Sequence, residues 1–184
     1  MRSYATLVLL IGAVYAQPAM LEIQNSFEFE DALTENQTHL WVWRSEASGL
    51  KTLSVTDQVG LSAIELTLCI EPYDATQNVT IRIDDIRYSN DGPSDLIVLR
   101  FNGITIGNFT TLEKWRSGHE WNVFRNSGNI GPGLNLSKGT YTLVLYPLTD
   151  QWGVEFDKMR VNAENQNSDP EKKLFCGASF FVAQ

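Results

Sequence analysis

Two glutamates near the start of the chain are spaced so that they could bind a metal ion. Residues 26–31 read SFEFED, with Glu28 and Glu30 on one side of an extended strand and Phe27 and Phe29 on the other. Two carboxylates on one side of a strand repel each other unless a cation or hydrogen-bond donors lie between them. Hard cations such as Ca²⁺ prefer such oxygen ligands. The alternative is a pair of solvated residues on an edge strand.

Residues that commonly perform catalysis are sparse in this chain. His39 and His119 are the only two histidines, and neither lies in a metal-ligand spacing. No serine lies in a nucleophile-elbow pattern. Acid pairs such as Asp84 and Asp85 could serve glycoside hydrolysis, which needs two carboxyl groups across a cleft, but turns and bulges account for them more simply. The sequence therefore predicts a protein that is not an enzyme.

The two cysteines, Cys69 and Cys176, could form one disulfide. An oxidising compartment permits such a bond, and closing a loop of about a hundred residues would stabilise the fold by about 4 to 5 kcal/mol in the chain-entropy model. Cys69 lies on the less apolar face of its strand, opposite Leu66 and Leu68, where a returning tail could reach it. Intermolecular pairing through Cys176 is the open alternative.

The start of the chain has the features of a secretory signal peptide over residues 1–16. Arg2 precedes an apolar run from Leu7 to Val14, and a small-residue cleavage site ends at Ala16. The run is too short to span a bilayer as a helix, so no membrane insertion is expected. Four Asn-x-Ser/Thr sequons follow, at Asn36, Asn78, Asn108 and Asn135. Together these features predict a secreted, glycosylated protein.

The charge of the chain limits its partners. The formal net charge is −8, which argues against nucleic acid or heparin as a ligand. An acidic chain is compatible with a bound cation, although solubility explains the same balance.

Short strands separated by Gly, Asn and Pro turns organise the chain, and no stretch keeps a helical period for more than two turns. Strands are expected at 26–31, 40–43, 51–55, 63–71, 78–88, 96–101, 104–107, 140–145 and 154–161, with a further strand after 121. Asn102 and Gly103 form the strongest hairpin signal. Apolar residues that fall out of phase predict β-bulges near Asp84–Asp85 and near Asp157–Lys158. The strand 96–101 is apolar on both faces and is expected to be central. This pattern predicts a single all-β domain, an antiparallel β-sandwich.

The domain is expected to span residues 26–162. A polar lead segment, 17–25, precedes it, and a tail, 163–184, follows it. The tail ends in the apolar stretch LFCGASFFVAQ, which either docks on the sandwich through Cys176 or is the stub of a longer membrane-attached form.

Several segments, in their order and spacing, resemble the carbohydrate-binding modules of families 6 and 35. These segments are SFEFEDA, ASGLKTL, IRYSNDGPSDLIVLRFNG, HEWNVF, LSKGTYTLVLY and GVEFDKMRV. Each motif is weak alone, and their shared order is the more specific signal. The resemblance implies a galactose-binding-like jelly roll that binds a glycan or glycoprotein without catalysis.

The resemblance also implies roles for particular residues. Glu28, Glu30 and Asp157 match carboxylates that hold a structural calcium ion in such modules. Trp121 matches an aromatic residue that stacks on a sugar ring. Glu155 stands where many members carry an asparagine that hydrogen-bonds the sugar. Because a carboxylate only accepts hydrogen bonds, the sugar preferences of the families do not transfer to this chain.

Antiparallel strand order places the loops 89–94, 108–120 and 148–153 at one end of the sandwich. Besides Trp121, this end would carry Tyr88, Trp115 and Trp152, and we expect Tyr88 and Trp152 to contact the ligand. The sequons at Asn78 and Asn135 would lie near the other end, whereas a glycan on Asn108 could crowd the aromatic end. Trp41 and Trp43 are expected to pack in the core.

These observations predict a secreted, lectin-like carbohydrate-binding module with a structural calcium ion. The alternative is an extracellular protein-interaction or matrix domain that uses the same sandwich without sugar recognition. The sugar and the oligomeric state are left open.

Overall fold

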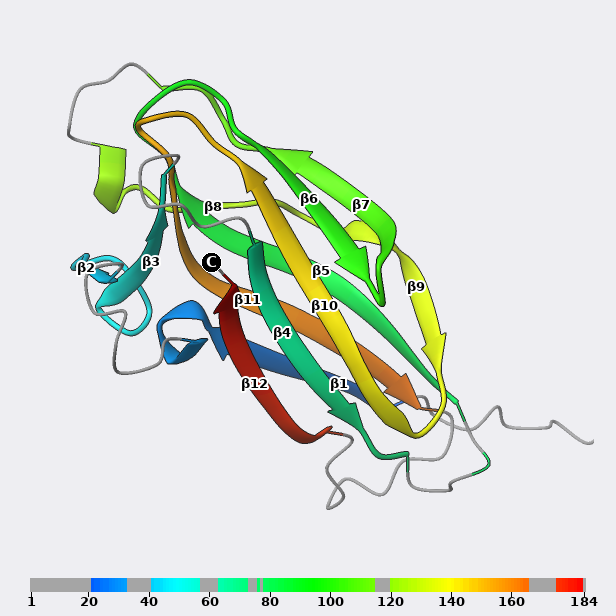
Figure 1. The fold of residues 1–184 in the computed structure, drawn as a ribbon. Coiled ribbons are helices and arrows are strands. Elements are labelled where there is room, and N and C mark those ends of the chain that lie inside the picture. Colours follow the sequence, from blue (N-terminus) through cyan, green and yellow to red (C-terminus); the bar gives the residue numbers. More distant parts are fainter. Residues whose placement is uncertain are drawn as a thin grey trace, which may run out of the picture.

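The fold was examined in a computed structural model, which describes residues 21–32, 41–56, 63–72, 76, 78–114, 120–165 and 175–183. These residues form two antiparallel β-sheets, and the predicted all-β sandwich is confirmed (Figure 1). The predicted signal peptide, Asn36, Trp115 and both histidines lie outside the described residues. No helix in the described part of the chain is long and apolar enough to cross a membrane.

The first sheet has seven strands in the order β2-β3-β11-β5-β8, with β1 paired to β11 and β9 paired to β5. Its strands are β1 (Leu21–Glu28), β2 (Trp41–Trp43), β3 (Lys51–Val55), β5 (Val79–Ser89), β8 (Arg125–Asn126), β9 (Ile130–Leu136) and β11 (Val154–Asn165). The long strand β11 pairs with β1, β3 and β5, so it positions residues from both ends of the chain.

The second sheet has five strands in the order β12-β4-β10-β6-β7. Its strands are β4 (Ala63–Ile70), β6 (Leu96–Phe101), β7 (Ile104–Thr110), β10 (Gly139–Leu148) and β12 (Phe175–Ala183). Asn102 and Gly103 join β6 to β7 with φ angles of 46° and 81°, the left-handed conformation that a two-residue hairpin of this type requires. The predicted hairpin is confirmed.

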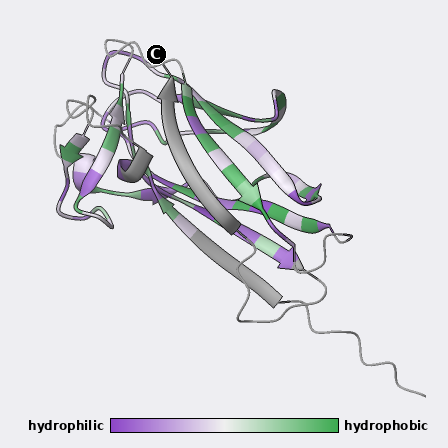
Figure 2. Cartoon of the chain, turned by 60° about the horizontal axis from the view of Figure 1, so that its bottom comes forward, coloured by the Kyte–Doolittle hydropathy of each residue, from purple (hydrophilic) through white to green (hydrophobic). Residues whose placement is uncertain are grey.

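The core lies between the two sheets, where alternate strand residues point inward. Figure 2 shows hydrophobic and hydrophilic residues alternating along the strands. The rings of Phe29 and Phe156 meet inside with centroids 5.4 Å apart. In β6 only Ile97, Leu99 and Phe101 are buried. The expectation that this strand is central is confirmed, because β6 pairs with both β10 and β7. Its other face is solvated.

Both predicted bulges are present. The register between β11 and β5 shifts between Phe156 and Lys158, and again where Arg160 and Val161 oppose β5 around Asp84. The first shift leaves Asp157 as an extra residue in β11. A bulge redirects a side chain out of the ladder, and here it aims Asp157 at the functional site.

The sandwich is larger than the span 26–162 predicted for it. β1 begins at Leu21, so the lead segment 17–25 contributes to the first sheet. β12, in the predicted tail 163–184, pairs with β4 along its length. β1 begins in the polar lead segment, and β12 lies in the apolar stretch whose docking on the sandwich the sequence left open.

The β12–β4 register bears on the cysteines. Gly177 lies opposite Cys69, and the register is irregular between Phe175 and Gly177. Cys69 is disulfide-bonded, and Cys176 is the only other cysteine in the sequence.

Candidate functional site

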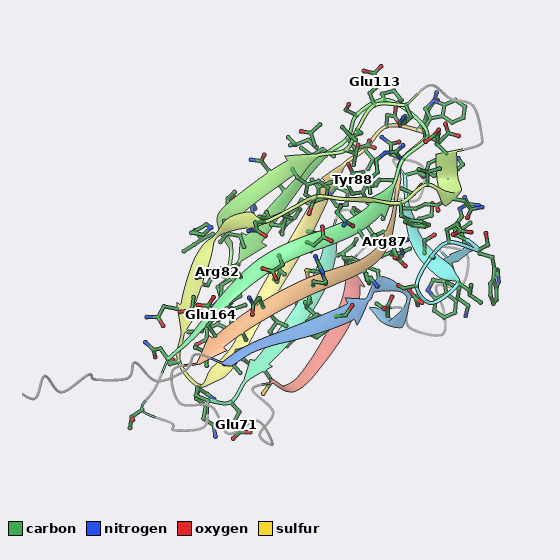
Figure 3. All side chains as sticks on the ribbon, turned by 180° about the vertical axis from the view of Figure 1, so that it is seen from behind. Glu71, Arg82, Arg87, Tyr88, Glu113 and Glu164 are labelled. Atoms are coloured by element: carbon green, nitrogen blue, oxygen red, sulfur yellow. The ribbon has the colours of Figure 1, made fainter. Side chains whose placement is uncertain are left out.

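Three loops meet at one end of the sandwich, as strand order predicts. The Thr111 amide donates to the Asp95 carbonyl over 2.9 Å, and the Lys114 amide donates to the Gly92 carbonyl over 2.8 Å. The Asp150 amide donates to Asp95 Oδ1 over 3.2 Å. Figure 3 shows Glu113 at this end and Glu71 at the opposite one. We call residues 89–95, 111–114 and 148–153 the loop end.

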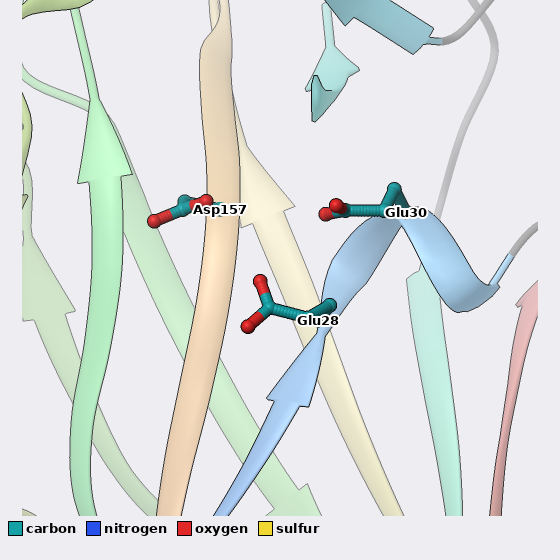
Figure 4. Close-up of side chains that lie close together, drawn as sticks. All are labelled: Glu28, Glu30 and Asp157. Carbon is teal, nitrogen blue, oxygen red and sulfur yellow. The ribbon is translucent and has the colours of Figure 1, made fainter. Parts of the chain in front are cut away.

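Glu28, Glu30 and Asp157 come together, as the resemblance implies. Each offers a carboxylate oxygen, and these oxygens lie within 4.8 Å of one another. Glu28 ends β1, Glu30 lies in the short helix η1 (Phe29–Ala32), and both carboxylates point toward β11, which carries Asp157 (Figure 4). The glutamates are half-buried and Asp157 is buried.

The turn between β2 and β3 covers this carboxylate cluster. The Ser48 amide and hydroxyl both donate to Asp157 Oδ1 over 2.8 Å, and the same hydroxyl donates to Glu28. A Cβ on Gly49 would lie 1.5 Å from Glu30 Oε1, so a larger residue there would displace the Glu30 carboxylate from its present position. Three carboxylates and one hydroxyl form an oxygen-rich set that fits a hard cation such as Ca²⁺.

Arg87 lies beside the same cluster. It forms an ion pair with the second oxygen of Asp157, and its Nη2 donates to the Glu46 carbonyl over 2.9 Å. Its guanidinium also lies over the Phe124 ring, 4.5 Å from the centroid. Arg87 therefore neutralises part of the cluster, and the remaining carboxylate charge is what a cation would compensate.

A second set of contacts joins the same turn to β11. Arg44 holds Glu155 with two hydrogen bonds, Nε to Oε2 over 2.7 Å and Nη2 to Oε1 over 2.5 Å. The Thr52 hydroxyl donates to Oε2 over 3.0 Å. Glu155 is 2% exposed. Such a bidentate pair fixes the plane of the guanidinium as well as its position.

Trp121 lies against this arginine. It belongs to the short helix η4 (Glu120–Asn122) and is half-buried, with the Arg44 guanidinium carbon 5.8 Å from its ring centroid. The Ser89 hydroxyl donates to the Glu120 carbonyl over 2.9 Å, and Arg125 pairs with the Glu120 carboxylate at 2.7 Å. A fixed indole and a fixed guanidinium thus lie side by side.

Two residues predicted to contact the ligand, Tyr88 and Glu155, are buried, and their contact with a ligand stays a prediction. Tyr88 is 2% exposed, packs on Phe109 and accepts a hydrogen bond from the Leu112 amide over 3.2 Å. Glu155 is paired with Arg44, whose side chain is partly exposed. Sequence reasoning did not identify Arg44, which lies 111 residues from Glu155 in the chain.

Two exposed tryptophans lie outside this pair. Trp152 is 40% exposed and packs against Gly92, where an added Cβ would lie 3.0 Å from that of Trp152. Trp43 is 69% exposed. The expectation that Trp43 packs in the core is wrong, because β2 is a three-residue edge strand and Trp43 lies at its end. Trp41 is half-buried.

Three predicted glycosylation sites can be located. Asn78, Asn108 and Asn135 are all exposed. Asn135 lies opposite Thr80, the third residue of the Asn78 sequon, so these two sites are neighbours on β5 and β9. Asn108 lies on β7, in the other sheet.

The loop end holds a carboxyl group with a shifted pKa. Burial raises the pKa of Asp95 from 3.8 to about 6, and the charge of Asp150 adds to this, whereas hydrogen bonds from the Asp150 amide and the Thr111 hydroxyl oppose it. Asp95 is 2% exposed. No cationic side chain contributes to this shift.

Comparisons with solved structures give neighbours of the same architecture. No protein-family model matches the sequence, and no curated protein matches it significantly. A family 35 carbohydrate-binding module from Clostridium thermocellum is similar over 74% of this chain and 97% of its own, with 17% identity and a TM-score of 0.48. The C-terminal family 6 module of the laminarinase LamC from Zobellia galactanivorans is similar over 76% of this chain and 98% of its own, with 16% identity and a TM-score of 0.46.

A catalytic protein also appears among the neighbours. The exo-β-1,3-galactanase of Phanerochaete chrysosporium, solved with galactose, is similar over 76% of this chain but only 29% of its own length, with 15% identity and a TM-score of 0.45. These neighbours include members of the two module families that the sequence resembles.

Proposed function

We propose that this protein is a secreted, non-catalytic carbohydrate-binding module whose sugar site is centred on Trp121 and Arg44. The single observation that carries the proposal is the contact between the half-buried Trp121 indole and an arginine fixed by Glu155. A pyranose offers apolar C–H faces that stack on an indole and hydroxyls that accept hydrogen bonds. Arg44 only donates hydrogen bonds, so it would select sugars that present acceptors at the edge of the stacked ring.

The carboxylate cluster is proposed to hold a structural calcium ion. Glu28, Glu30 and Asp157 would be the ligands, and Ca²⁺ would supply the positive charge that links the first strand to β11. The turn residue Ser48 contacts this cluster, and Arg44 begins the same turn. Ion binding would therefore also steady the sugar site.

Titration of a glycan identified on an array tests the sugar site. We expect Trp121→Ala to weaken binding about tenfold or more, which corresponds to about 1.4 kcal/mol. Arg44→Lys should weaken it too, because lysine lacks the planar fork that Glu155 orients. Ile104→Ala, at an exposed residue on β7, is the control, and Trp152→Ala tests the predicted contact of Trp152 with the ligand. Equal affinity of wild type and Trp121→Ala would exclude this site, and release of reducing ends from the same glycan would exclude the non-catalytic assignment.

Thermal unfolding with and without a chelator tests the calcium ion. A ligand that binds only the folded state raises stability by about 2.7 kcal/mol at a hundred times its dissociation constant. We expect added Ca²⁺ to raise the Tm of wild type and to leave that of Glu30→Gln unchanged. A chelator that leaves the wild-type Tm unaffected would rule out the ion.

Secretion and glycosylation are proposed from the signal sequence and the sequons. Asn78, Asn108 and Asn135 are exposed, which oligosaccharide transfer requires. Expression in a eukaryotic secretory host should yield a protein in the medium whose mass falls on treatment with an N-glycosidase. A protein that stays in the cells unmodified would contradict this.

A specific observation favours a second candidate, a protein-interaction domain. Three leucines are exposed near the loop end, Leu96 at 38%, Leu112 at 56% and Leu148 at 61%, and Leu96 lies opposite Leu148 in the β6–β10 pair. Exposed apolar groups of this kind occur at protein interfaces. A partner that is captured after deglycosylation, and lost on Leu148→Asp but not on Trp121→Ala, would favour this candidate.

A further inference from the structure

A lysine lies between two tryptophans on the hairpin formed by β2 and β3. Lys51 Nζ is 4.8 Å from the ring centroid of Trp41 and 5.1 Å from that of Trp43. Trp43 is the direct cross-strand neighbour of Lys51, and Trp41 is two residues along the same strand. By the pleat of a strand, Trp41 and Trp43 point to the same face. The three side chains form one continuous surface, which we call the Trp-Lys ladder.

The ladder differs from ordinary core packing in its exposure. Trp43 is 69% exposed, the largest exposed fraction among the tryptophans described. An indole is usually buried because it removes a large apolar area from water. Here the ring contributes little to the core, so the fold does not explain its position.

The hairpin that carries the ladder is rigidly held. The Arg44 amide donates to the Leu50 carbonyl over 3.1 Å, and Leu50 adopts a φ of 62° to close the turn. Behind it, Thr52 is anchored on Glu155 and Ser48 on Asp157. A binding surface that is fixed before the ligand arrives loses little entropy on binding.

Among the described residues, Lys51 has no acidic ion-pair partner, whereas Arg44, Arg87 and Arg125 each have one. Aromatic faces attract an ammonium group but leave its charge uncompensated. An anionic group on a ligand would complete the interaction as a charge-assisted hydrogen bond.

We propose that the Trp-Lys ladder is a second binding site, which takes a pyranose bearing one acidic substituent. The apolar face of the sugar stacks on Trp43, and its carboxylate or sulfate accepts hydrogen bonds from Lys51. Because the net charge of the protein is −8, long polyanions are repelled and a short acidic oligosaccharide is the expected ligand.

The ladder is separate from the sugar site at Trp121. Thr52 points toward Glu155, so the adjacent residue Lys51 points to the opposite face of the strand. The two sites therefore use opposite faces of one hairpin, and each can be removed without the other.

Calorimetric titration with trigalacturonate tests the ladder, with the neutral methyl ester of the same trisaccharide as the matched ligand. We expect the wild type to bind the acid about tenfold more tightly than the ester. Trp43→Ala and Lys51→Gln should each weaken binding of the acid about tenfold, while Ile104→Ala, an exposed residue on β7 outside both sites, binds it as wild type does. A sulfated galactose disaccharide and its unsulfated parent form the second arm, which decides between carboxylate and sulfate.

Three results would overturn the proposal. These are no binding of either acidic probe by the wild type, equal affinity for the acid and its ester, and an unchanged affinity of Trp43→Ala. Melting temperatures show whether each variant is folded, and Trp43→Phe, which keeps a stacking ring, should retain part of the affinity. Loss of trigalacturonate binding on Trp121→Ala but not on Trp43→Ala would overturn the ladder and leave the proposed function standing, so the two failures can be told apart.

Discussion

Two regions of this protein bury carboxylates, and they compensate the charge in different ways. In the hairpin corner, formed by β2, β3, the turn between them and the facing part of β11, Glu155 pairs with Arg44 and Asp157 pairs with Arg87. At the loop end, the described residues give the Asp95 carboxylate only the Asp150 amide and the Thr111 hydroxyl. Within the described part of the chain, the first region supplies positive charge, whereas the second supplies dipoles.

The difference shows what a buried carboxylate needs in order to stay ionised. An arginine placed against it offsets much of the lost hydration, although its later removal is costly. Dipoles offset less, so the group takes up a proton at a higher pH, and burial raises the pKa of Asp95 to about 6. In the hairpin corner the arginine contacts fix the positions of Glu155 and Asp157, which suits a preorganised binding site.

Removing the arginine from the hairpin corner is expected to give the largest effect. Arg44→Ala leaves Glu155, whose side chain is 3% exposed, without a counter-charge. We expect the free energy of unfolding in urea to fall by about 3 kcal/mol. The double variant Arg44→Ala, Glu155→Gln should recover part of the lost free energy of unfolding, because it also removes the unpaired charge of Glu155. A single variant within about 0.5 kcal/mol of wild type would mean that the pair contributes no more than a surface ion pair.

The sequence predicted the architecture because patterning is local. The break in parity at Asp157 and Lys158 located a bulge that depends on a few neighbouring residues. The Asn102–Gly103 hairpin was equally evident, since the turn chemistry lies in two adjacent residues. Edge strands β1 and β12 were missed, because their pairing depends on partners far away in the chain.

The site was less predictable than the fold. Arg44 and Glu155 are 111 residues apart, and no local pattern links them. For Tyr88 a signal existed, since it shares parity with the buried Ile86 on β5 and so points into the core. The sequence gives no signal that Trp43 is exposed, because a three-residue strand is too short for periodicity to distinguish a buried face from an exposed one.

Asp95→Asn tests the loop end. We expect it to raise the free energy of unfolding, by less than Arg44→Ala lowers it. Because the pKa of Asp95 is raised from 3.8 to about 6, the folded protein binds more protons than the unfolded chain between these values. Stability therefore falls as pH rises from about 4 to 6 and stays lower above this range. Asparagine keeps an oxygen for the Asp150 amide but carries no charge.

We expect Asp95→Asn to be more stable than wild type by about 2 kcal/mol at pH 7.5, since each unit of pKa difference corresponds to about 1.4 kcal/mol and relaxation of the loops offsets part of it. At about pH 4 the two proteins should unfold alike. Urea titrations at both pH values provide the measurement. A variant that is less stable at pH 7.5 would show that the Asp95 charge is better compensated than its surroundings indicate.

The surface pair of Glu71 and Lys138 is a third environment for a carboxylate. Its removal is expected to change stability the least. Here a carboxylate has a cation partner, at 2.6 Å, but no burial. The hydrogen bond from Lys138, followed by its charge, lowers the pKa of Glu71 below 4.5. Lys138→Gln should return that pKa toward 4.5, as followed by the pH dependence of the Glu71 side-chain carboxyl carbon resonance in NMR spectra.

A lowered carboxyl pKa stabilises the fold above the unfolded value and loses this contribution as pH falls through the folded one. For an exposed pair, solvent and salt screen the interaction, so Lys138→Gln should leave the urea midpoint at pH 7 unchanged. A clear loss of stability in Lys138→Gln would mean that an ion pair stabilises the fold even when its carboxylate is exposed. Burial would then not be needed to explain the effect of Arg44→Ala. An unchanged midpoint, set against a large loss for Arg44→Ala, would assign the difference to burial.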